Sequence, residues 1–371
     1  MKIGIITYHA AYNFGSVLQA YATQIMLEQM GYETQIINYR PKSQKRFYGI
    51  VCTGNGYRRF MKSLIHLVHL KKRLIRKDKY ESFISRRMKT TEEFSNPLDA
   101  KEYSDRYNIY LSGSDQIWNK HSHELYNMSW DYMDPYLLTF TDKPKISYAS
   151  SINNTTEEEL INIIPKVRKF SSISCREEKT SQMLCRLLNR DVATVLDPTM
   201  MINREKWLSL VPQDRIINDE YILYYSLRGI DDIKKDITKL HRFNIKIIII
   251  CPLSPISSSK DVINFVDAGP EDFLRLIRDA KCIFTASYHG LLFSVNFNKD
   301  FYAIKSKNPS QNLRAINILS KIHMEERLID DIESINIDNE RLSFASANEA
   351  IYKMREKSKS YLEKSIAMIS K

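Results

Sequence analysis

The stretch Lys2-Ile3-Gly4-Ile5-Ile6-Thr7, with the two segments that follow it, decides the fold. It is a short apolar run of the kind that forms a buried strand. Residues 16–30 then show helical periodicity up to Gly31, and residues 34–39 form a second apolar run. Strand, helix and strand in this order predict a βαβ unit, whose strands are parallel. We therefore expect residues 7–16 at the carboxyl edge of the sheet, where α/β proteins bind ligands.

The same alternation of strand and helix signals continues to the end of the chain. Further strands are predicted over 107–112, 145–150, 172–175, 192–196, 221–226, 246–251, 282–286 and 301–304, and helices over 156–167, 180–188, 231–241, 270–280, 291–297 and 346–369. The step Asp197-Pro198 disfavours helix at Asp197 and marks a junction near residue 200. We expect an α/β protein with domains over 1–200 and 201–345, and a C-terminal helix over 346–371 that packs back on the first domain.

Length and composition exclude several classes of protein. A chain of 371 residues exceeds what one core usually organises, and 43% hydrophobic with 27% charged residues is typical of globular proteins. No segment approaches the roughly 20 apolar residues of a spanning helix, and the N-terminal run is too short for a signal peptide, so we expect a cytoplasmic protein. The five cysteines lack disulfide or zinc-ligand spacing, which predicts reduced, mostly buried thiols and no metal. They are Cys52, Cys175, Cys185, Cys251 and Cys282.

Much of the net charge of +11 lies between Arg40 and Lys79. Residues 60–76 have apolar side chains at helical spacing and end in a run of Lys and Arg. This pattern fits an interfacial helix on an anionic bilayer, with contact through residues 60–77, and equally a core-packing helix with a solvated basic end. No recognised nucleic-acid motif accompanies the charge, so we expect no nucleic-acid partner.

Three of the ten glycines follow predicted strands: Gly15, Gly113 and Gly290. Glycine there lets main-chain amides approach an anionic ligand closely, although turn geometry would require the same residue. His289 lies between a strand and Gly290, at the start of a helix, which favours a catalytic group over a buried structural histidine.

Two further positions carry polar chemistry after predicted strands. Residues 112–119, Ser-Gly-Ser-Asp-Gln-Ile-Trp-Asn, suit recognition of a sugar or a phosphate, or else a helix N-cap. Arg176 fits a clamp for a carboxylate or phosphate, or else a surface ion pair with Glu177 or Glu178.

Taken in order, these motifs resemble the polysaccharide pyruvyl transferase family over nearly the whole chain. The resemblance is carried by residues 4–9, 13–21, 113–119, 147–150, Arg176-Glu177, 196–199, 269–274 and Ser287-Tyr288-His289-Gly290. It implies a glycosyltransferase-B-like fold, with two Rossmann-like domains facing across a cleft. It also implies transfer of pyruvate from phosphoenolpyruvate, as co-substrate and without other cofactor, onto two hydroxyls of a sugar as a cyclic ketal.

The acceptors of this family are typically precursors of bacterial surface polysaccharides. A lipid-linked acceptor would explain the basic helical insert at about 42–80 in the first domain, the expected acceptor side, and would bring the protein to the inner face of the plasma membrane.

The resemblance also assigns roles to residues. His289 matches the general acid of the family, and Asp115 is our candidate for the base or for a group that accepts a hydrogen bond from a sugar hydroxyl. The residues expected to bind substrate are Arg176, Asn13, Gly15, Ser16, Gln19, Ser114, Ser287, Tyr288 and Gly290. Some members have an arginine where this chain has Ser287, so Arg176, and with it Arg228 or Lys305, would have to supply the missing positive charge.

Two other functions fit the same sequence. A glycosyltransferase of this fold would bind a nucleotide sugar in its second domain. A non-catalytic scaffold in polysaccharide assembly would tolerate substitution of His289 and depend on Lys71, Lys72 and Arg73.

Overall fold

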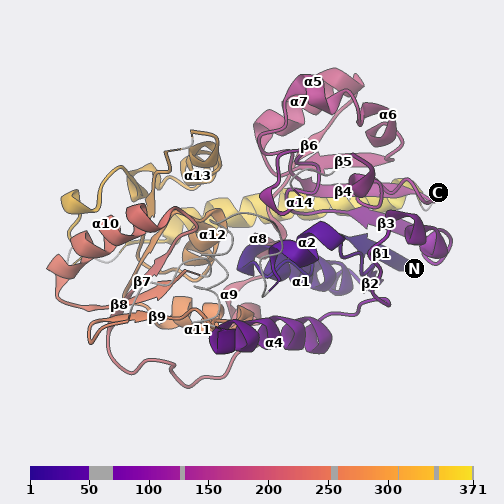
Figure 1. Cartoon of the computed structure of the whole chain (residues 1–371). Coiled ribbons are helices and arrows are strands. Elements are labelled where there is room, and N and C mark those ends of the chain that lie inside the picture. The colour runs from indigo at the N-terminus through magenta and orange to yellow at the C-terminus, as the bar shows by residue number, and fades with distance from the viewer. Residues whose placement is uncertain (50–69, 126–129, 252–257, 308, 338–341, 370–371) are drawn as a thin grey trace. The chain divides into compact units, whose positions relative to one another are not determined.

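The chain folds into two compact units, each built around one sheet (Figure 1). The computed structural model describes residues 1–49, 70–125, 130–251, 258–307, 309–337 and 342–369. Of these, 1–49, 81–202 and 353–369 belong to the first unit, and the others belong to the second. The chain passes from the first unit to the second after Ile202, near the junction expected from the Asp197-Pro198 step. The expected cleft between the domains stays a prediction.

The first unit contains a six-stranded sheet in the order β2-β1-β3-β4-β5-β6, and every neighbouring pair is parallel. Its strands are β1 (Lys2–Ile6), β2 (Glu33–Ile36), β3 (Ile109–Ser112), β4 (Lys145–Ser150), β5 (Ser172–Cys175) and β6 (Ala193–Thr194). A parallel sheet covered on both faces needs apolar residues in succession, because both faces are buried. The Ile5-Ile6 pair of β1 is fully buried, as this rule requires.

Three helices of the first unit begin at capping side chains, those of Asn13, Thr156 and Asp197. The helices of this unit are α1 (Phe14–Gln29), α2 (Lys42–Phe47), α5 (Glu157–Leu160), α6 (Ile164–Val167), α7 (Glu178–Leu188) and α8 (Pro198–Met201), with 3-10 turns at Pro97–Tyr103, His123–Leu125 and Trp130–Met133. Thr156 and Glu159 form a capping box at the start of α5. The single helix expected over 156–167 is divided in two, because Pro165 fits the first turn of a new helix and not the interior of one.

The second unit repeats the plan with the strand order β12-β11-β10-β7-β8-β9, again fully parallel. Its strands are β7 (Tyr221–Tyr225), β8 (Lys246–Ile250), β9 (Val262–Asn264), β10 (Cys282–Thr285), β11 (Phe301–Ile304) and β12 (Leu328–Ile329). Its helices are α9 (Arg204–Leu208), α10 (Ile230–Leu240), α11 (Pro270–Asp279), α12 (Tyr288–Asn296) and α13 (Pro309–Lys321), with 3-10 turns at His241–Phe243, Glu325–Arg327 and Ile332–Ser334.

The long helix α14 (Ala345–Ile369) returns to the first unit from residue 353 onward. The Ser358 hydroxyl accepts a hydrogen bond from the Leu196 amide at 2.9 Å, and the Tyr361 hydroxyl donates one to the Ser147 carbonyl at 2.9 Å. The prediction of a C-terminal helix that packs back on the first domain is therefore confirmed.

The basic segment differs from its expected place in the fold. The described helix α4 runs from Leu70 to Arg87, and residues 60–69 of the predicted helix lie outside the described residues. Residues 70–80 belong to the second unit, where Lys79 pairs with Asp272 at 2.8 Å. The insert expected over 42–80 of the first domain therefore ends within the second unit.

Two general expectations can be compared with the described residues. None of their helices has the length and apolar character needed to cross a membrane.

The four described cysteines are free thiols. Cys175, Cys251 and Cys282 are buried and Cys185 is partly buried, while Cys52 lies outside the described residues. Burial is the main reason that the pKa of the Cys282 thiol rises to about 12, so this thiol stays protonated.

Candidate functional site

Both sheets reverse their strand order at one position, and the candidate residues lie in the loops at these positions. In the first sheet, β2 lies on one side of β1 and β3 on the other, so the loops after β1 and β3 diverge. In the second sheet, β7 and β10 have the same relationship. Open α/β sheets bind ligands at such topological switch points, at the carboxyl ends of the strands. Ser16 and Asp115 follow the first pair of strands, and His289 follows β10.

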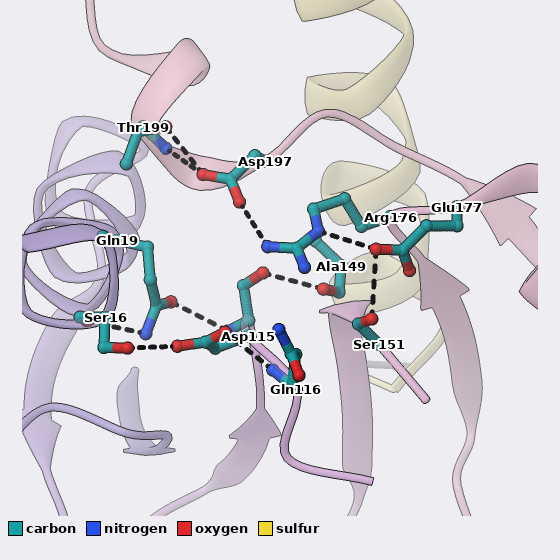
Figure 2. A network of polar contacts seen from close by, with 12 residues as sticks. Ser16, Gln19, Asp115, Gln116, Ala149, Ser151, Arg176, Glu177, Asp197 and Thr199 are labelled. Atoms are coloured by element: carbon teal, nitrogen blue, oxygen red, sulfur yellow. Dashed lines mark hydrogen bonds and ion pairs between the residues drawn. The ribbon is translucent and has the colours of Figure 1, made fainter. Parts of the chain in front are cut away.

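Asp115 is held in a defined orientation at the first switch point (Figure 2). One carboxylate oxygen accepts a hydrogen bond from the Ser16 hydroxyl at 2.5 Å, and the other accepts one from the Gln116 amide at 2.8 Å. The backbone of Asp115 is in the left-handed region, with φ of 75°. Its carbonyl accepts a hydrogen bond from the Ser151 amide at 3.0 Å, which joins the loop to the end of β4. The carboxylate is thus fixed before any ligand binds.

Gln19 and Ser114 were expected to bind substrate. In the structure their side chains stabilise this loop from inside the protein. Both side chains are fully enclosed. The Gln19 amide nitrogen donates to the Thr7 hydroxyl at 2.8 Å, and its oxygen accepts from the Ser114 amide at 3.2 Å. The Ser114 hydroxyl donates to the Ala149 carbonyl at 2.7 Å. Because these polar groups are bonded inside the protein, we place neither residue against substrate.

The start of α1 uses its polar groups for capping. The Asn13 side chain accepts a hydrogen bond from the Gly15 amide at 2.9 Å, as an N-cap residue does. The predicted role of the Gly15 amide as an anion donor therefore competes with this cap. His9, in the same loop, is buried, and burial followed by the charge of Arg40 lowers its pKa to about 4.

Packing explains the glycines at positions 113 and 290. A Cβ atom on Gly113 would lie 2.1 Å from the Tyr148 carbonyl oxygen, and one on Gly290 would lie 2.2 Å from the Thr285 hydroxyl oxygen. Gly290 is also inside helix α12, where its amide is 3.4 Å from the hydroxyl of the capping residue Ser287. Close packing, which our sequence argument did not consider for these positions, is sufficient reason for both glycines.

Arg176 lies inside the first unit, between two carboxylates (Figure 2). Its Nη1 donates to Asp197 at 2.9 Å and its Nε donates to Glu177 at 3.0 Å, while only 1% of the side chain is exposed. Asp197 also caps α8 by accepting from the amide and hydroxyl of Thr199 at 2.9 and 2.7 Å. This arrangement differs both from a clamp open to substrate and from a surface ion pair. The enclosed guanidinium holds the end of β5 against the start of α8.

His289 occupies the first turn of α12, at the second switch point. Ser287 caps this helix, and the Ser287 amide donates to the Thr285 hydroxyl at 3.0 Å. The Thr285 hydroxyl in turn donates to the Tyr225 carbonyl at the end of β7, at 2.8 Å. His289 as a whole is partly exposed, while its Nε2 atom is enclosed. An imidazole at a helix N-terminus is suited to act on an anionic ligand, since the first-turn amides favour negative charge there.

Arg314 was missed by the sequence interpretation, because it lies outside the quoted motifs and is one of 55 lysines and arginines in the chain. Its guanidinium lies over the Tyr288 ring at 5.5 Å from the centroid, and the Tyr288 ring contacts that of His289 at 5.6 Å. Two of the three cations that we expected to supply the missing positive charge are paired elsewhere. Arg228 binds Asp236, and Lys305 binds Asp330 at 2.8 Å.

The described residues contain no group of three or more His, Cys, Asp or Glu side chains that could hold a metal ion. The described side chains at the two switch points include an oriented carboxylate, Asp115, in the first unit and an imidazole beside a helix N-terminus, His289, in the second.

Comparison with solved structures identifies the class of fold. The UDP-GlcNAc 2-epimerase of Methanocaldococcus jannaschii is 12% identical, with 96% of this chain and 99% of that chain covered and a TM-score of 0.51. The S. aureus MnaA structure with UDP is 9% identical, with 96% and 87% covered and a TM-score of 0.52. At these identities the likeness shows the fold alone, and together with the two parallel sheets it confirms the predicted α/β, glycosyltransferase-B-like class.

The family is shown by sequence. The model of the polysaccharide pyruvyl transferase family matches residues 13–308, and the chain belongs to this family. The predicted resemblance is therefore confirmed, and the protein is a transferase of polysaccharide biosynthesis. No protein of curated function matches the sequence.

Proposed function

We propose that this transferase moves the pyruvyl group of phosphoenolpyruvate onto a sugar of a surface-polysaccharide precursor and forms a cyclic pyruvate ketal. The observation that carries the proposal is the family match over residues 13–308, which includes the Ser287-Tyr288-His289-Gly290 motif. The position of His289 at a switch point and in the first turn of α12 supports a role in catalysis.

The reaction needs one proton donor and two proton acceptors. In the first step a sugar hydroxyl bonds to C2 of phosphoenolpyruvate and loses its proton, while C3 gains a proton and the double bond is consumed. In the second step the bond from C2 to the phosphate oxygen breaks, a second hydroxyl bonds to C2, and its proton leaves with the phosphate. Phosphoenolpyruvate and a diol thus give a ketal and inorganic phosphate.

We assign His289 as the acid that protonates C3, and Asp115 as a group that accepts a hydrogen bond from the sugar. The amino end of α12 and the Arg314 guanidinium over Tyr288 are the best placed groups in the second unit to bind phosphate. Arg176 acts as a positioning residue, because its side chain is enclosed between Asp197 and Glu177.

The test is phosphate release from phosphoenolpyruvate in the presence of a panel of lipid-linked and nucleotide-linked sugars. Replacing His289 by Ala removes the proton donor and should lower the rate by about 10²–10⁴-fold without unfolding the protein. His241→Ala is the matched control, because His241 is exposed at the end of α10. Unchanged turnover in the His289 variant would rule out its role as the acid.

A separate binding measurement distinguishes this proposal from a nucleotide-sugar glycosyltransferase of the same fold. A ligand of the native state raises the melting temperature. We expect phosphoenolpyruvate to raise it and UDP-N-acetylglucosamine to leave it unchanged, and the reverse result would favour the glycosyltransferase.

We further propose a lipid-linked acceptor, with peripheral membrane contact through residues 60–77. Of this range, residues 70–77 lie in α4, where Leu74 is 47% exposed and Ile75 is 36% exposed beside the exposed Lys71 and Lys72. Apolar side chains among lysines suit an anionic bilayer. Cosedimentation with phosphatidylglycerol vesicles should fall in a Lys71→Glu, Lys72→Glu variant, and equal cosedimentation would contradict the contact.

A further inference from the structure

Glu124 is a partly buried carboxyl group of the first unit that the roles assigned above do not use. It lies in the 3-10 turn His123–Leu125, and both of its oxygens accept hydrogen bonds. Gln44 donates to one oxygen at 2.8 Å, and the hydroxyl of Tyr48 donates to the other. Gln44 belongs to α2 and Tyr48 follows that helix, so Glu124 joins α2 to the segment after β3.

Two tyrosine hydroxyls are enclosed in the core cluster that also contains Leu125, the residue after Glu124. Tyr8 is 3% exposed and Tyr136 is fully buried, and their rings meet edge to face at 5.0 Å. Within the part of the chain that the structure describes, neither hydroxyl has a hydrogen-bond partner. Burial is the largest cause that raises the pKa of both, and the charges of Glu124 and Asp115 add to it. Both hydroxyls therefore lie within electrostatic range of both carboxyls.

A bound ligand would supply hydrogen-bond partners to the two tyrosine hydroxyls. An enclosed hydroxyl without a partner destabilises the folded protein, and such a group in a native structure calls for an explanation. Two carboxylates repel an anion, so neither phosphate nor phosphoenolpyruvate suits these residues. A neutral molecule rich in hydroxyls does, since its O–H groups donate to carboxylate oxygens and its oxygens accept from tyrosine O–H groups.

We propose that Asp115, Glu124, Tyr8 and Tyr136 form the subsite for the two reacting hydroxyls of the acceptor sugar, and that Glu124 accepts the proton of the attacking hydroxyl. This inference rests on the proposed pyruvyl transfer. As the sugar oxygen bonds to C2 of phosphoenolpyruvate, the O–H bond breaks and its proton passes to the Glu124 carboxylate. The electron pair of the double bond takes up a separate proton at C3.

The ionisation of Glu124 supports this role. Burial raises its pKa to about 7, against the opposing effect of the hydrogen bonds from Tyr48 and Gln44, and the charge of Asp115 adds to the rise. The titratable and polar groups around it are Tyr8, Tyr48, Gln44, Asp115, Tyr132 and Tyr136. A carboxylate with this pKa is a stronger base than an ordinary glutamate. It is ionised in a large fraction of the protein molecules at neutral pH.

The test compares Glu124→Gln with Glu93→Gln, whose carboxyl is 38% exposed and pairs with Arg40 and Lys45. Acceptor binding is measured by saturation-transfer NMR with p-nitrophenyl glycosides of galactose, glucose, mannose and N-acetylmannosamine. Donor binding is measured separately, as the thermal shift caused by phosphoenolpyruvate. We expect Glu124→Gln to lower the rate of phosphate release by about 10²–10⁴-fold. The decline of this rate below pH 7, which the wild type should show, should be absent from the variant. The thermal shift caused by phosphoenolpyruvate should be unchanged. Glu93→Gln should match the wild type in each measurement.

Two further measurements keep the inference open to disproof. Tyr8→Phe removes one hydroxyl with little change of packing, and should raise the acceptor KM by about five- to tenfold. In protein labelled with ¹³C-glutamate, one carboxyl should titrate near pH 7 and be missing from the Glu124→Gln spectrum. Wild-type turnover and pH dependence in Glu124→Gln would overturn the inference, and so would a spectrum in which no carboxyl titrates near pH 7.

A different result would contradict the proposed function, namely the absence of a thermal shift with phosphoenolpyruvate in the wild type. The ¹³C titration and the sugar-binding measurement would then still test the subsite.

Discussion

The hydroxyl of Ser16 donates a 2.5 Å hydrogen bond to the carboxylate of Asp115, and this contact joins the first turn of α1, which follows β1, to the loop after β3. These two strands are neighbours in the sheet although 99 residues separate the two side chains. The bond orients Asp115 at the place where the sheet reverses its strand order. A carboxylate fixed in this way is suited to bind a ligand hydroxyl, because it needs no reorganisation when the ligand arrives.

Replacing Asp115 by Asn should reduce turnover strongly and leave the fold intact. The amide oxygen can still accept a hydrogen bond from the Gln116 amide, but the negative charge is lost. We expect phosphate release to fall by about 10–100-fold, because a hydrogen bond to a charged group is worth about 1.5–3 kcal/mol. The measurement is steady-state release from phosphoenolpyruvate with a sugar acceptor, with circular dichroism to verify folding.

Asp131→Asn is a suitable control for this prediction, because Asp131 lies in the 3-10 turn Trp130–Met133 and is exposed. Turnover in Asp115→Asn that equals turnover in the control would show that Asp115 has no part in the reaction.

The strands were predictable wherever a long apolar run had to be buried on both faces. The strand expected over 145–150 matches β4, and the apolar run over 246–251 matches β8 except for its last residue. The structure also contains β9 and β12, which have three and two residues and were not predicted. Strands this short carry no periodicity, and tertiary packing alone determines them.

The candidate site was predictable only in part, because long-range pairing decides which polar side chains are enclosed. Asp115 and His289 could be selected because each follows a predicted strand. The same criterion could not show that Arg176 is buried, because Asp197, the partner of Arg176, lies 21 residues away in the sequence. Glu124 follows no predicted strand, and nothing in its sequence neighbourhood indicates that its carboxyl is partly buried and bonded by Gln44 and Tyr48.

The enclosed ion pair of Arg176 predicts a large loss of stability on substitution. Arg176→Ala leaves the buried carboxylates of Asp197 and Glu177 without this cation, which typically costs about 3–5 kcal/mol. Arg186→Ala is the control, because Arg186 is 63% exposed in its pair with Glu157 and such pairs contribute about 0–1 kcal/mol. Urea unfolding followed by fluorescence of Trp118, which is in the same unit, measures both. Similar midpoints for the two variants would contradict the structural role of Arg176.

Gly290 predicts a steric effect at the start of α12. Alanine there would place its Cβ 2.2 Å from the Thr285 hydroxyl oxygen and 2.9 Å from a ring carbon of Tyr225. Overpacking of this kind costs about 1–3 kcal/mol, more than the roughly 1 kcal/mol by which alanine favours a helix over glycine. Gly229→Ala is the control, because its Cβ would meet no atom within 4 Å and should change stability by about 0.5 kcal/mol or less. Thermal unfolding that ranks the two variants equally would refute this explanation of Gly290.

The raised pKa of Glu124 makes a prediction about stability that needs no substrate. Burial raises its pKa to about 7 in the folded protein, from an ordinary value of 4.5. Between these two values the folded state holds the proton and the unfolded state does not, so protonation of Glu124 stabilises the fold as the pH falls from 7 to 4.5. Below pH 4.5 both states are protonated, and the contribution reaches its limit of about 3 kcal/mol.

This effect is measured as the difference in unfolding free energy between the wild type and Glu124→Gln. Subtraction is needed because His9, whose pKa is lowered to about 4, destabilises the fold over nearly the same pH range. The difference should change in favour of the wild type as the pH is lowered through 7, and level off below 4.5. A difference that stays constant over this range would mean that the carboxyl of Glu124 ionises like an ordinary glutamate, and the proposed base would lose the physical property that suits it to the reaction.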